Sequence, residues 1–208
     1  MRLADAISLR SRRRKLALFL ETMRPTAETT VLDIGVDDAG FGEIRMTEHG
    51  SCGTLNFFEQ AYPWPGQITA LGQHEGRAFG DRFPAIRYVQ GNAVELPFED
   101  SSFDIVYSNA VIEHVGGIET QRRFVAEALR VAPRAFITTP NRWFPVDVHT
   151  RLPLVHWLPE RLAHRGFDLA RKSWAKENRL LGPGELEELF PGDARIVNLG
   201  MTLAAIVG

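Results

Sequence analysis

Five short apolar segments divide the first two thirds of the chain. They are VLDIGV (31–36), QITALG (67–72), IRYVQG (86–91), FDIVYSN (103–109) and AFITTP (135–140). These segments are continuously apolar instead of alternating, as parallel strands are when helices cover both faces of a sheet. Between the last two segments, ETQRRFVAEALRVAP has apolar residues at helical spacing, namely Val125, Ala128, Leu129 and Ala132. The repeated strand and helix patterns predict an α/β fold with a doubly wound, mostly parallel sheet.

The C-terminal segment 183–208 has a different pattern. GELEELF predicts a short helix, and ARIVNLG and LAAIVG predict two strands joined by a very short link around Gly200 and Met201. A parallel crossover needs a dozen or more residues, so two adjacent strands with so short a link must be antiparallel. We therefore expect a seven-stranded sheet that ends in an antiparallel hairpin.

The N-terminal segment from Asp5 to Met23 is predicted to be a helix that ends before Pro25. Its apolar residues share one face at intervals of seven, four and three: Leu9, Leu16, Leu20 and Met23. The basic run RSRRRK (10–15) interrupts this stripe. One interpretation is a packed helix with a solvated basic turn, and this is the one we favour. The other is a cap over a binding site, or a patch that meets an anionic lipid or substrate.

A long connection, TPNRWFPVDVHTRLPLVHWLPERLAHRGF, separates the fifth strand from the last predicted helix. Bare connections in α/β folds need about 2–6 residues, so this segment is expected to shape a substrate site. Its candidate pocket residues are Arg142, Trp143, Phe144, His149, His156 and Trp157, which could alternatively pack the insertion together. His149 and His156 lie seven apart, but Pro153 intervenes and no carboxylate or cysteine supports the pair, so no metal site is predicted.

Length and composition fit one soluble domain. The chain has 208 residues, 44% of them hydrophobic, and a net charge of -2, which gives no general attraction to nucleic acid or acidic lipid. The single cysteine, Cys52, excludes an intramolecular disulfide and is interpreted as an incidental thiol. No secretory pattern and no apolar run of membrane-spanning length is present, so we expect a cytoplasmic protein without stable membrane insertion. The oligomeric state is not predicted.

Two sequence motifs resemble the class I S-adenosylmethionine-dependent methyltransferases. VLDIG is similar to the first motif of that family, and GNAVELPFEDSSFDIVYSNAVIEHV (91–115) is similar to its passage through the fourth strand, especially in the ubiquinone-type, small-molecule subgroup. The resemblance implies a single domain of four parts. These are an N-terminal helical cap (1–25), a cofactor-binding core (31–140), a substrate-shaping insertion (141–182) and a C-terminal helix and hairpin (183–208).

The resemblance also implies the residues that bind S-adenosylmethionine. Gly35 would let the backbone approach the methionine part of the cofactor, and Asp33 would reach its amino group or instead anchor the turn. Near the adenine the family implies a side chain at Asn92 and the backbone amide of Ala93. Asn109 and Val111 would line the open side of the cofactor.

The chain departs from the family pattern at two positions. Asp37 stands in the glycine-rich loop, where it would suit the positive charges of the cofactor, and Gly72 occupies the position at which the family has an acidic residue that binds the ribose. Gln73, Glu59 or Glu75 could replace that contact. The intact fourth-strand motif favours a working site over a lost one.

Methyl transfer from a sulfonium needs mainly alignment of donor and acceptor, and a base where the acceptor is a hydroxyl or phenol. His114 is the candidate base, since it follows the fourth strand and an unperturbed imidazole titrates near pH 6.5; its alternative role is to anchor the loop. Glu113 is interpreted as a structural hydrogen-bonding residue. The predicted function is methyl transfer to a small-molecule or lipid-like acceptor.

Three other functions were considered. A non-catalytic, scaffolding relative that lost its cofactor is the main alternative, and Asp37 and Gly72 favour it. A dinucleotide-dependent oxidoreductase would need the pattern G-x-G-x-x-G after the first strand, and GVDDAG does not supply it. A methyltransferase acting on nucleic acid is not expected, because the basic residues are concentrated in one helix.

Overall fold

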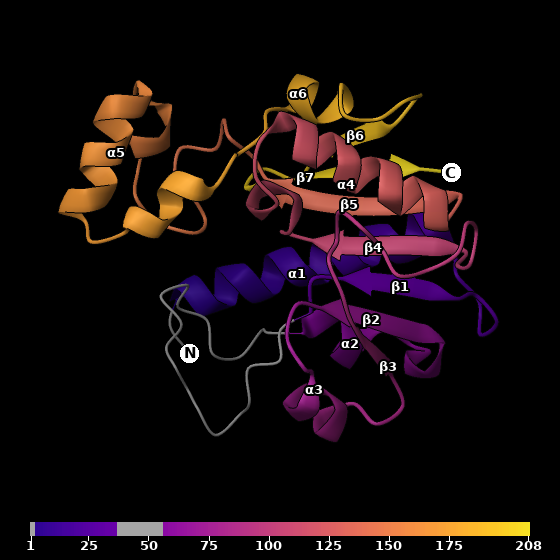
Figure 1. Ribbon diagram of the computed structural model, residues 1–208. Helices are drawn as coiled ribbons and strands as arrows, with labels where there is room; N and C mark the ends of the chain where they lie inside the picture. Colours follow the sequence, from indigo (N-terminus) through magenta and orange to yellow (C-terminus); the bar gives the residue numbers. More distant parts are fainter. Residues whose placement is uncertain (1–2, 37–55) are drawn as a thin grey trace.

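The computed structural model describes residues 3–36 and 56–208 (Figure 1). Asp37, a predicted cofactor-binding residue, and the single cysteine, Cys52, therefore lie outside the described residues. One sheet forms the centre of the molecule, with its strands in the order β3-β2-β1-β4-β5-β7-β6. The strands are β1 (Val31–Ile34), β2 (Ile68–Gly72), β3 (Arg87–Gln90), β4 (Ile105–Asn109), β5 (Arg134–Pro140), β6 (Arg195–Asn198) and β7 (Thr202–Val207).

The sheet confirms the predicted fold class. The first five strands are parallel, and β7 pairs antiparallel with both β5 and β6. Every residue of β1 and β2 is buried, which explains why their sequences do not alternate. The strand order reverses between β1 and β4, and ligands bind at the carboxyl ends of the strands at such a point in open α/β sheets.

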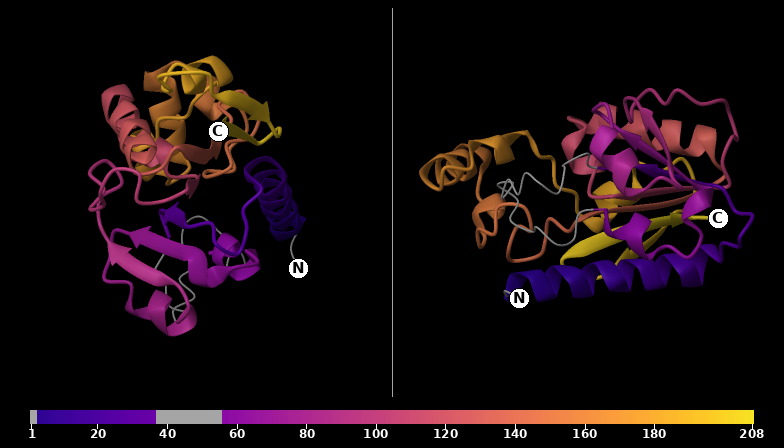
Figure 2. Two further views of the ribbon diagram at one scale, coloured as in Figure 1. Left: turned by 90° about the vertical axis from the view of Figure 1, so that its right-hand side faces the viewer. Right: turned by 90° about the horizontal axis from the view of Figure 1, so that it is seen from below.

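Helices cover both faces of the sheet (Figures 1 and 2). On one face lie α4 (Ile118–Val131), which packs on β4 and β5, and α6 (Pro183–Glu187), which packs on β6 and β7. On the other face lie α1 (Leu3–Met23), α2 (Phe57–Ala61) and α3 (Arg77–Arg82). Short 3₁₀ turns complete the connections: η1 (Pro65–Gln67), η2 (Ile112–His114), η3 (Val155–Trp157) and η4 (Ser173–Glu177). No helix in the described ranges is both long and apolar enough to cross a membrane.

Helix α1 is joined to the sheet by aromatic packing. Phe19 is fully buried, and its ring meets the rings of Phe58, Tyr62, Tyr107 and Phe136 edge-on at centroid distances of 5.3–6.1 Å. The N-terminal turns of α1 extend past the strands towards the insertion (Figure 2). This placement brings side chains of α1 to the edge of the sheet at which β1 and β4 end.

The segment 141–182 forms a small unit beside the sheet (Figure 1). It contains η3, η4 and α5 (Glu160–Leu169), whose buried residues Ala163, Phe167 and Ala175 make a separate hydrophobic cluster. The bridge between Asn141 and Leu181 brings the two ends of the segment together. The segment therefore leaves the sheet after β5 and returns to nearly the same place.

Candidate active site

A cavity of about 730 Å³ lies at the carboxyl ends of β1, β4 and β5. Besides these strand ends, the lining comes from α1, the turn after β1, α2, the residues that follow β4, the beginning of the insertion and the link from β6 to β7. Its polar side chains include Arg12, Lys15, Asp33, Glu59, Asn109, His114 and His149. These residues are distant in the sequence, and the topological switch point of the sheet brings them together.

Two buried carboxyl groups, Asp33 and Glu59, lie on the sheet side of the cavity. Asp33 is 4% exposed in the middle of β1, where Ala70 and Tyr107 are its neighbours on the adjoining strands. Burial, with the charge of Glu59, raises the pKa of Asp33 well above its usual value. Burial also raises the pKa of Glu59, to about 7, although the backbone and Arg12 act in the opposite direction. A positively charged ligand would favour the ionised form of both groups.

Two basic side chains from α1 face the same cavity. Lys15 is 6% exposed, and its Nζ donates a hydrogen bond to Asn109 Oδ1, which also accepts one from Thr138 Oγ1 at 3.0 Å. Burial, and then the charge of Arg12, lowers the pKa of Lys15 to about 7. The favoured interpretation of a solvated basic turn is thus correct for Arg13 and Arg14, which are exposed, and wrong for Arg12 and Lys15.

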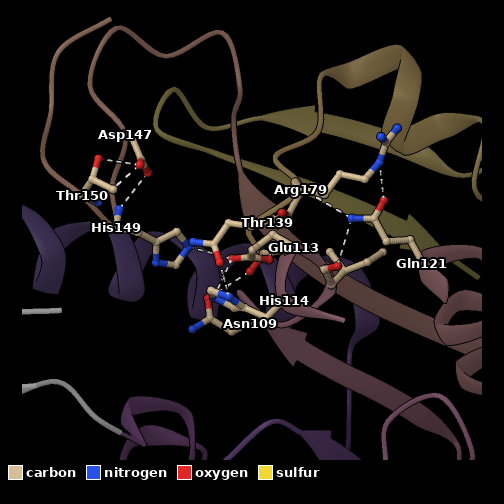
Figure 3. Close-up of polar contacts among 12 residues, drawn as sticks. Asn109, Glu113, His114, Gln121, Thr139, Asp147, His149, Thr150 and Arg179 are labelled. Carbon is tan, nitrogen blue, oxygen red and sulfur yellow. Dashed lines mark hydrogen bonds and ion pairs between the residues drawn. The ribbon is translucent and has the colours of Figure 1, made fainter. Parts of the chain in front are cut away.

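A hydrogen-bonded cluster follows β4 (Figure 3). Glu113 is fully buried; its Oε1 lies 3.0 Å from His149 Nε2, and its Oε2 accepts from Thr139 Oγ1 at 3.1 Å. Burial lowers the pKa of His149, but the hydrogen bond and charge of Glu113 outweigh that effect and leave it raised. The predicted hydrogen-bonding role of Glu113 is confirmed, and the insertion is tied to the end of β4 through it.

His114 lies beside this pair and lines the cavity. Its Nδ1 is 2.9 Å from Asn178 Oδ1, so Nδ1 carries the proton if the carbonyl oxygen of Asn178 is the partner. Nε2 lies 3.9 Å from Glu113 Oε1, and the ring is 4.8 Å from that of His149. Asn178 therefore holds the ring of His114 beside Glu113 at the cavity lining.

The same three side chains form a set of possible metal ligands. One ligand atom each from Glu113, His114 and His149 lie within 4.8 Å of one another. From the sequence, His149 and His156 were weighed as a metal-binding pair and no metal site was predicted; in the structure, the histidine beside His149 is His114. The hydrogen bonds to Thr139 and Asn178 account for this arrangement without an ion.

The ligand-free protein is expected to be least stable near pH 7. Glu59 has a folded pKa of about 7, above its unfolded value of about 4.3, so its contribution to stability falls as the pH rises through that interval. Lys15 has a folded pKa of about 7, below its unfolded value of about 10.4, so its contribution rises with pH above 7. Urea unfolding at pH 5, 7 and 9 measures both slopes.

Two variants separate these contributions. Lys15→Met should remove the rise above pH 7. Glu59→Gln should reduce the fall below it, to which Asp33, whose pKa is also raised, contributes as well. Each is expected to stabilise the protein at pH 7 by at least about 1 kcal/mol, since one pKa unit corresponds to about 1.4 kcal/mol. The exposed Arg13→Met is the control for Lys15→Met. If the free energies of unfolding of the wild type and Lys15→Met changed equally with pH above 7, Lys15 would not be the source of the rise.

The turn after β1 is determined by packing within the protein. Gly35 has φ +96°, and a Cβ there would lie 2.2 Å from Val111 Cγ2. The amides of Gly35 and Val36 both donate to the carbonyl of Leu71, at 2.8 and 3.3 Å. Val111 therefore occupies the space that a side chain at position 35 would need, independently of any ligand.

Packing within the protein also explains why a glycine stands at position 72. A Cβ at this position would lie 2.3 Å from Tyr88 Oη, whose hydroxyl donates to the carbonyl of His74 at 2.7 Å. A Cβ at Gly76 would also meet the ring of Tyr88, at 2.1 Å. An acidic side chain at the end of β2 is thus excluded by Tyr88 of β3. The sequence alone did not indicate that Tyr88 would lie against Gly72 and Gly76.

The expected cofactor-binding residues are divided between two places. Asp33, Gly35 and Asn109 line the main cavity, while Gln73 and Asn92 line a second hollow with Gln90 and Gly91. Ala93 is buried in the core, and Val111 packs beside Gly35. Of the residues considered as replacements for the ribose contact, Glu59 faces the main cavity and Gln73 the second hollow.

The insertion contributes fewer cavity residues than its sequence suggested. Phe144 and His149 line the cavity. Trp143 and Trp157 are 58% and 42% exposed, and Trp157 Nε1 donates to the carbonyl of Arg142 at 2.7 Å. His156 Nε2 lies 3.0 Å from the carbonyl of Phe144. The alternative of packing within the insertion therefore describes His156 and Trp157.

The sequence reasoning missed Arg12 and Lys15 as site residues. A signal was present, because Lys15, Phe19 and Met23 recur at intervals of four and so share one helix face. Phe19 and Met23 are buried, and a lysine in line with them is expected to be buried as well. Long charged residues are rarely buried without a functional or pairing reason.

Comparisons with known proteins agree with this architecture. A family profile described as a methyltransferase domain matches residues 51–134. A protein of Mycobacterium tuberculosis (strain H37Rv), named a probable S-adenosylmethionine-dependent methyltransferase, is 41% identical over 64 residues. That match covers 29% of this chain and 22% of the relative. A similarly named protein of Mycolicibacterium smegmatis is 33% identical over 99 residues, 42% of this chain and 37% of the relative.

Solved structures show the same fold. The PH0226 protein of Pyrococcus horikoshii OT3 aligns with a TM-score of 0.59 at 16% identity, over 96% of this chain and 90% of that one. A 1,6-didemethyltoxoflavin-N1-methyltransferase of Burkholderia thailandensis, with S-adenosylhomocysteine bound, aligns with a TM-score of 0.54 at 18% identity, over 95% and 77%. The resemblance stated from VLDIG and the fourth-strand passage is confirmed.

Proposed function

We propose that this chain, which has the class I S-adenosylmethionine-dependent methyltransferase fold and resembles such enzymes in sequence, transfers a methyl group from S-adenosylmethionine to a small-molecule or lipid-like acceptor. The observation that carries the proposal is the pair of buried carboxyl groups in the cavity beside the turn after β1. S-adenosylmethionine has two positive centres, its sulfonium and its ammonium. Asp33 and Glu59 would ionise against them, which offsets the cost of burying their charges.

The remaining cofactor contacts are proposed from position. Gly35 and Asn109 would lie beside the methionine part, with Asp37 and Val111 near them. Gln73 would take the ribose in place of the acid that Tyr88 excludes at Gly72, and Asn92 with the amide of Ala93 would meet the adenine, next to the second hollow. The Burkholderia enzyme binds a small molecule, 1,6-didemethyltoxoflavin, together with S-adenosylhomocysteine, which supports an acceptor of similar class.

His114 is the proposed base for an acceptor with a hydroxyl or phenol group. S-adenosylmethionine would supply the methyl group, which would pass from its sulfur to the acceptor oxygen, and His114 would take the proton that the acceptor loses. Asn178 holds Nδ1 at 2.9 Å and so would orient the ring. A positioned base of this kind contributes about 10²–10⁴-fold in rate. In this proposal α1, the proposed cap, and the insertion 141–182 enclose the acceptor, while 31–140 binds the cofactor and 183–208 completes the sheet.

Calorimetric titration with S-adenosylmethionine and S-adenosylhomocysteine tests the proposal. Binding with a dissociation constant on the order of micromolar is expected for the wild type. Asp33→Asn should weaken it by about tenfold or more, because the substitution removes a buried charge that faces the cofactor. Asp81→Asn, an exposed carboxylate on α3, is the matched control and should bind as the wild type does.

Absence of binding of both ligands at about millimolar concentration would overturn the proposal. The non-catalytic alternative would then account for the retained fold. If the wild type and Asp33→Asn bound the ligands with equal affinity, the cofactor would bind this protein but would not contact the carboxylate of Asp33.

A further inference from the structure

The ammonium group of Lys15 is buried, and within 3–36 and 56–208 it has no anionic partner. Its hydrogen bond goes to Asn109 Oδ1, an uncharged amide oxygen, and no carboxylate of the described residues forms an ion pair with it. An ammonium has three N–H donors, so its bonding capacity exceeds this one contact. A buried charge is normally paired or hydrogen-bonded on all sides, because its desolvation costs several kcal/mol.

The charges around Lys15 do not compensate it. The two that act on it most are Arg12, which is also positive, and Glu113, whose carboxylate already bonds His149 and Thr139. Arg12 lies one turn earlier on α1, and its charge also acts on Glu59. The cavity is therefore lined both by the carboxyl groups of Asp33 and Glu59 and by the basic side chains of Arg12 and Lys15.

The cavity is also lined by apolar side chains. These are Ile7, Phe144, Val146 and Met201, together with the ring of Tyr107. Such a lining binds hydrocarbon or aromatic surface, while Lys15 and Arg12 can hold one anionic group. Both features belong to a single cavity.

We propose that Lys15, with Arg12, binds the carboxylate of the methyl acceptor, so that the acceptor is an amphipathic acid with an apolar body. This inference rests on the proposed methyl transfer, in which the cofactor would contact Asp33 and Glu59. Lys15 is then a positioning residue. It holds the acceptor by its anion and directs the reacting atom towards the sulfonium and His114.

The depressed pKa of Lys15 adds a linkage to this binding. A bound carboxylate stabilises the ammonium form, so binding is accompanied by proton uptake above pH 7. Other groups that act on Lys15 or line the same cavity are Arg12, Glu113, His149, His114, Asp33, Glu59 and Tyr107. The part of the pH dependence that belongs to Lys15 is therefore the part that Lys15→Met removes.

The test uses matched acids and alcohols as probes. Octanoate is compared with 1-octanol, and 4-hydroxybenzoate with 4-hydroxybenzyl alcohol, by titration into the full chain with and without saturating S-adenosylhomocysteine. At pH 6.5 at least one acid is expected to bind about tenfold or more tightly than its alcohol, which corresponds to the contribution of one charge-assisted contact. Lys15→Met should lose this preference, whereas Arg13→Met, exposed on the same helix, should keep it. The preference should also shrink between pH 7 and 9 in the wild type.

Three results would overturn the inference. The first is equal affinity for acids and alcohols in the wild type, or no binding of either acid at about 10 mM. The second is an acid preference that Lys15→Met retains. The third is a loss of S-adenosylhomocysteine affinity in Lys15→Met with no loss for 5′-methylthioadenosine, which lacks the amino-acid part; Lys15 would then bind the carboxylate of the cofactor. Failure of the wild type to bind S-adenosylhomocysteine refutes the proposed function instead, and the titrations without it still decide the acid preference.

Discussion

Replacing Phe19 with alanine is expected to lower the free energy of unfolding by about 3–5 kcal/mol. The side chain is fully buried, and its ring meets four others edge-on, from α2, β4, β5 and the residue after α2. Truncation removes the burial of the ring and leaves a cavity, and this range already includes the loss of the ring's aromatic contacts. Urea unfolding followed by circular dichroism measures the change.

Two further variants of α1 keep this prediction testable if the alanine variant does not fold. Phe19→Leu retains most of the volume and should cost about 1.5 kcal/mol or less. Glu21→Ala changes an exposed position on the same helix and should alter stability by less than about 0.5 kcal/mol. A cost below about 1 kcal/mol for Phe19→Ala would mean that α1 is not part of the core. Lys15, one turn before Phe19, would then have no fixed place in the cavity.

Gly35→Ala is expected to destabilise the protein by about 2–6 kcal/mol. The new Cβ would lie 2.2 Å from Val111 Cγ2, and overpacking of this kind costs about 1–3 kcal/mol. The backbone at φ +96° adds strain on the order of 1–3 kcal/mol for a residue with a Cβ. Thermal and urea unfolding of the ligand-free variant measure the sum.

Double substitution separates the two causes. Gly35→Ala combined with Val111→Ala removes the clash and keeps the backbone strain, so it should recover part of the stability relative to the sum of the single variants. Gly66→Ala is the control, because a Cβ at Gly66 meets nothing within 4 Å. If Gly35→Ala were as stable as Gly66→Ala, the expected clash with Val111 would be refuted. The requirement for glycine would then come from the cofactor alone.

The fold was accessible from the sequence because its signals are local. Continuous apolar runs such as QITALG identify strands that are buried on both faces, and the short link at Gly200 requires an antiparallel pair. The place of the site also followed, since the carboxyl ends of β1 and β4 meet wherever a doubly wound sheet reverses its strand order. Asp33, Asn109 and His114 were expected there, and the structure places all three around one cavity.

The chemistry of that cavity depended on contacts between distant segments. Lys15 was interpreted as solvated because its neighbours in the sequence are basic, yet the aromatic packing of Phe19 turns it towards Asn109. Gly72 was interpreted as a departure from the family pattern, yet Tyr88 of the next strand occupies the space of its missing side chain. Local sequence determines which segments are strands and helices, because propensity and burial act over a few residues. Which charges are buried, and which side chains exclude one another, is decided only when the elements pack, because desolvation and steric contact depend on all the neighbours at once.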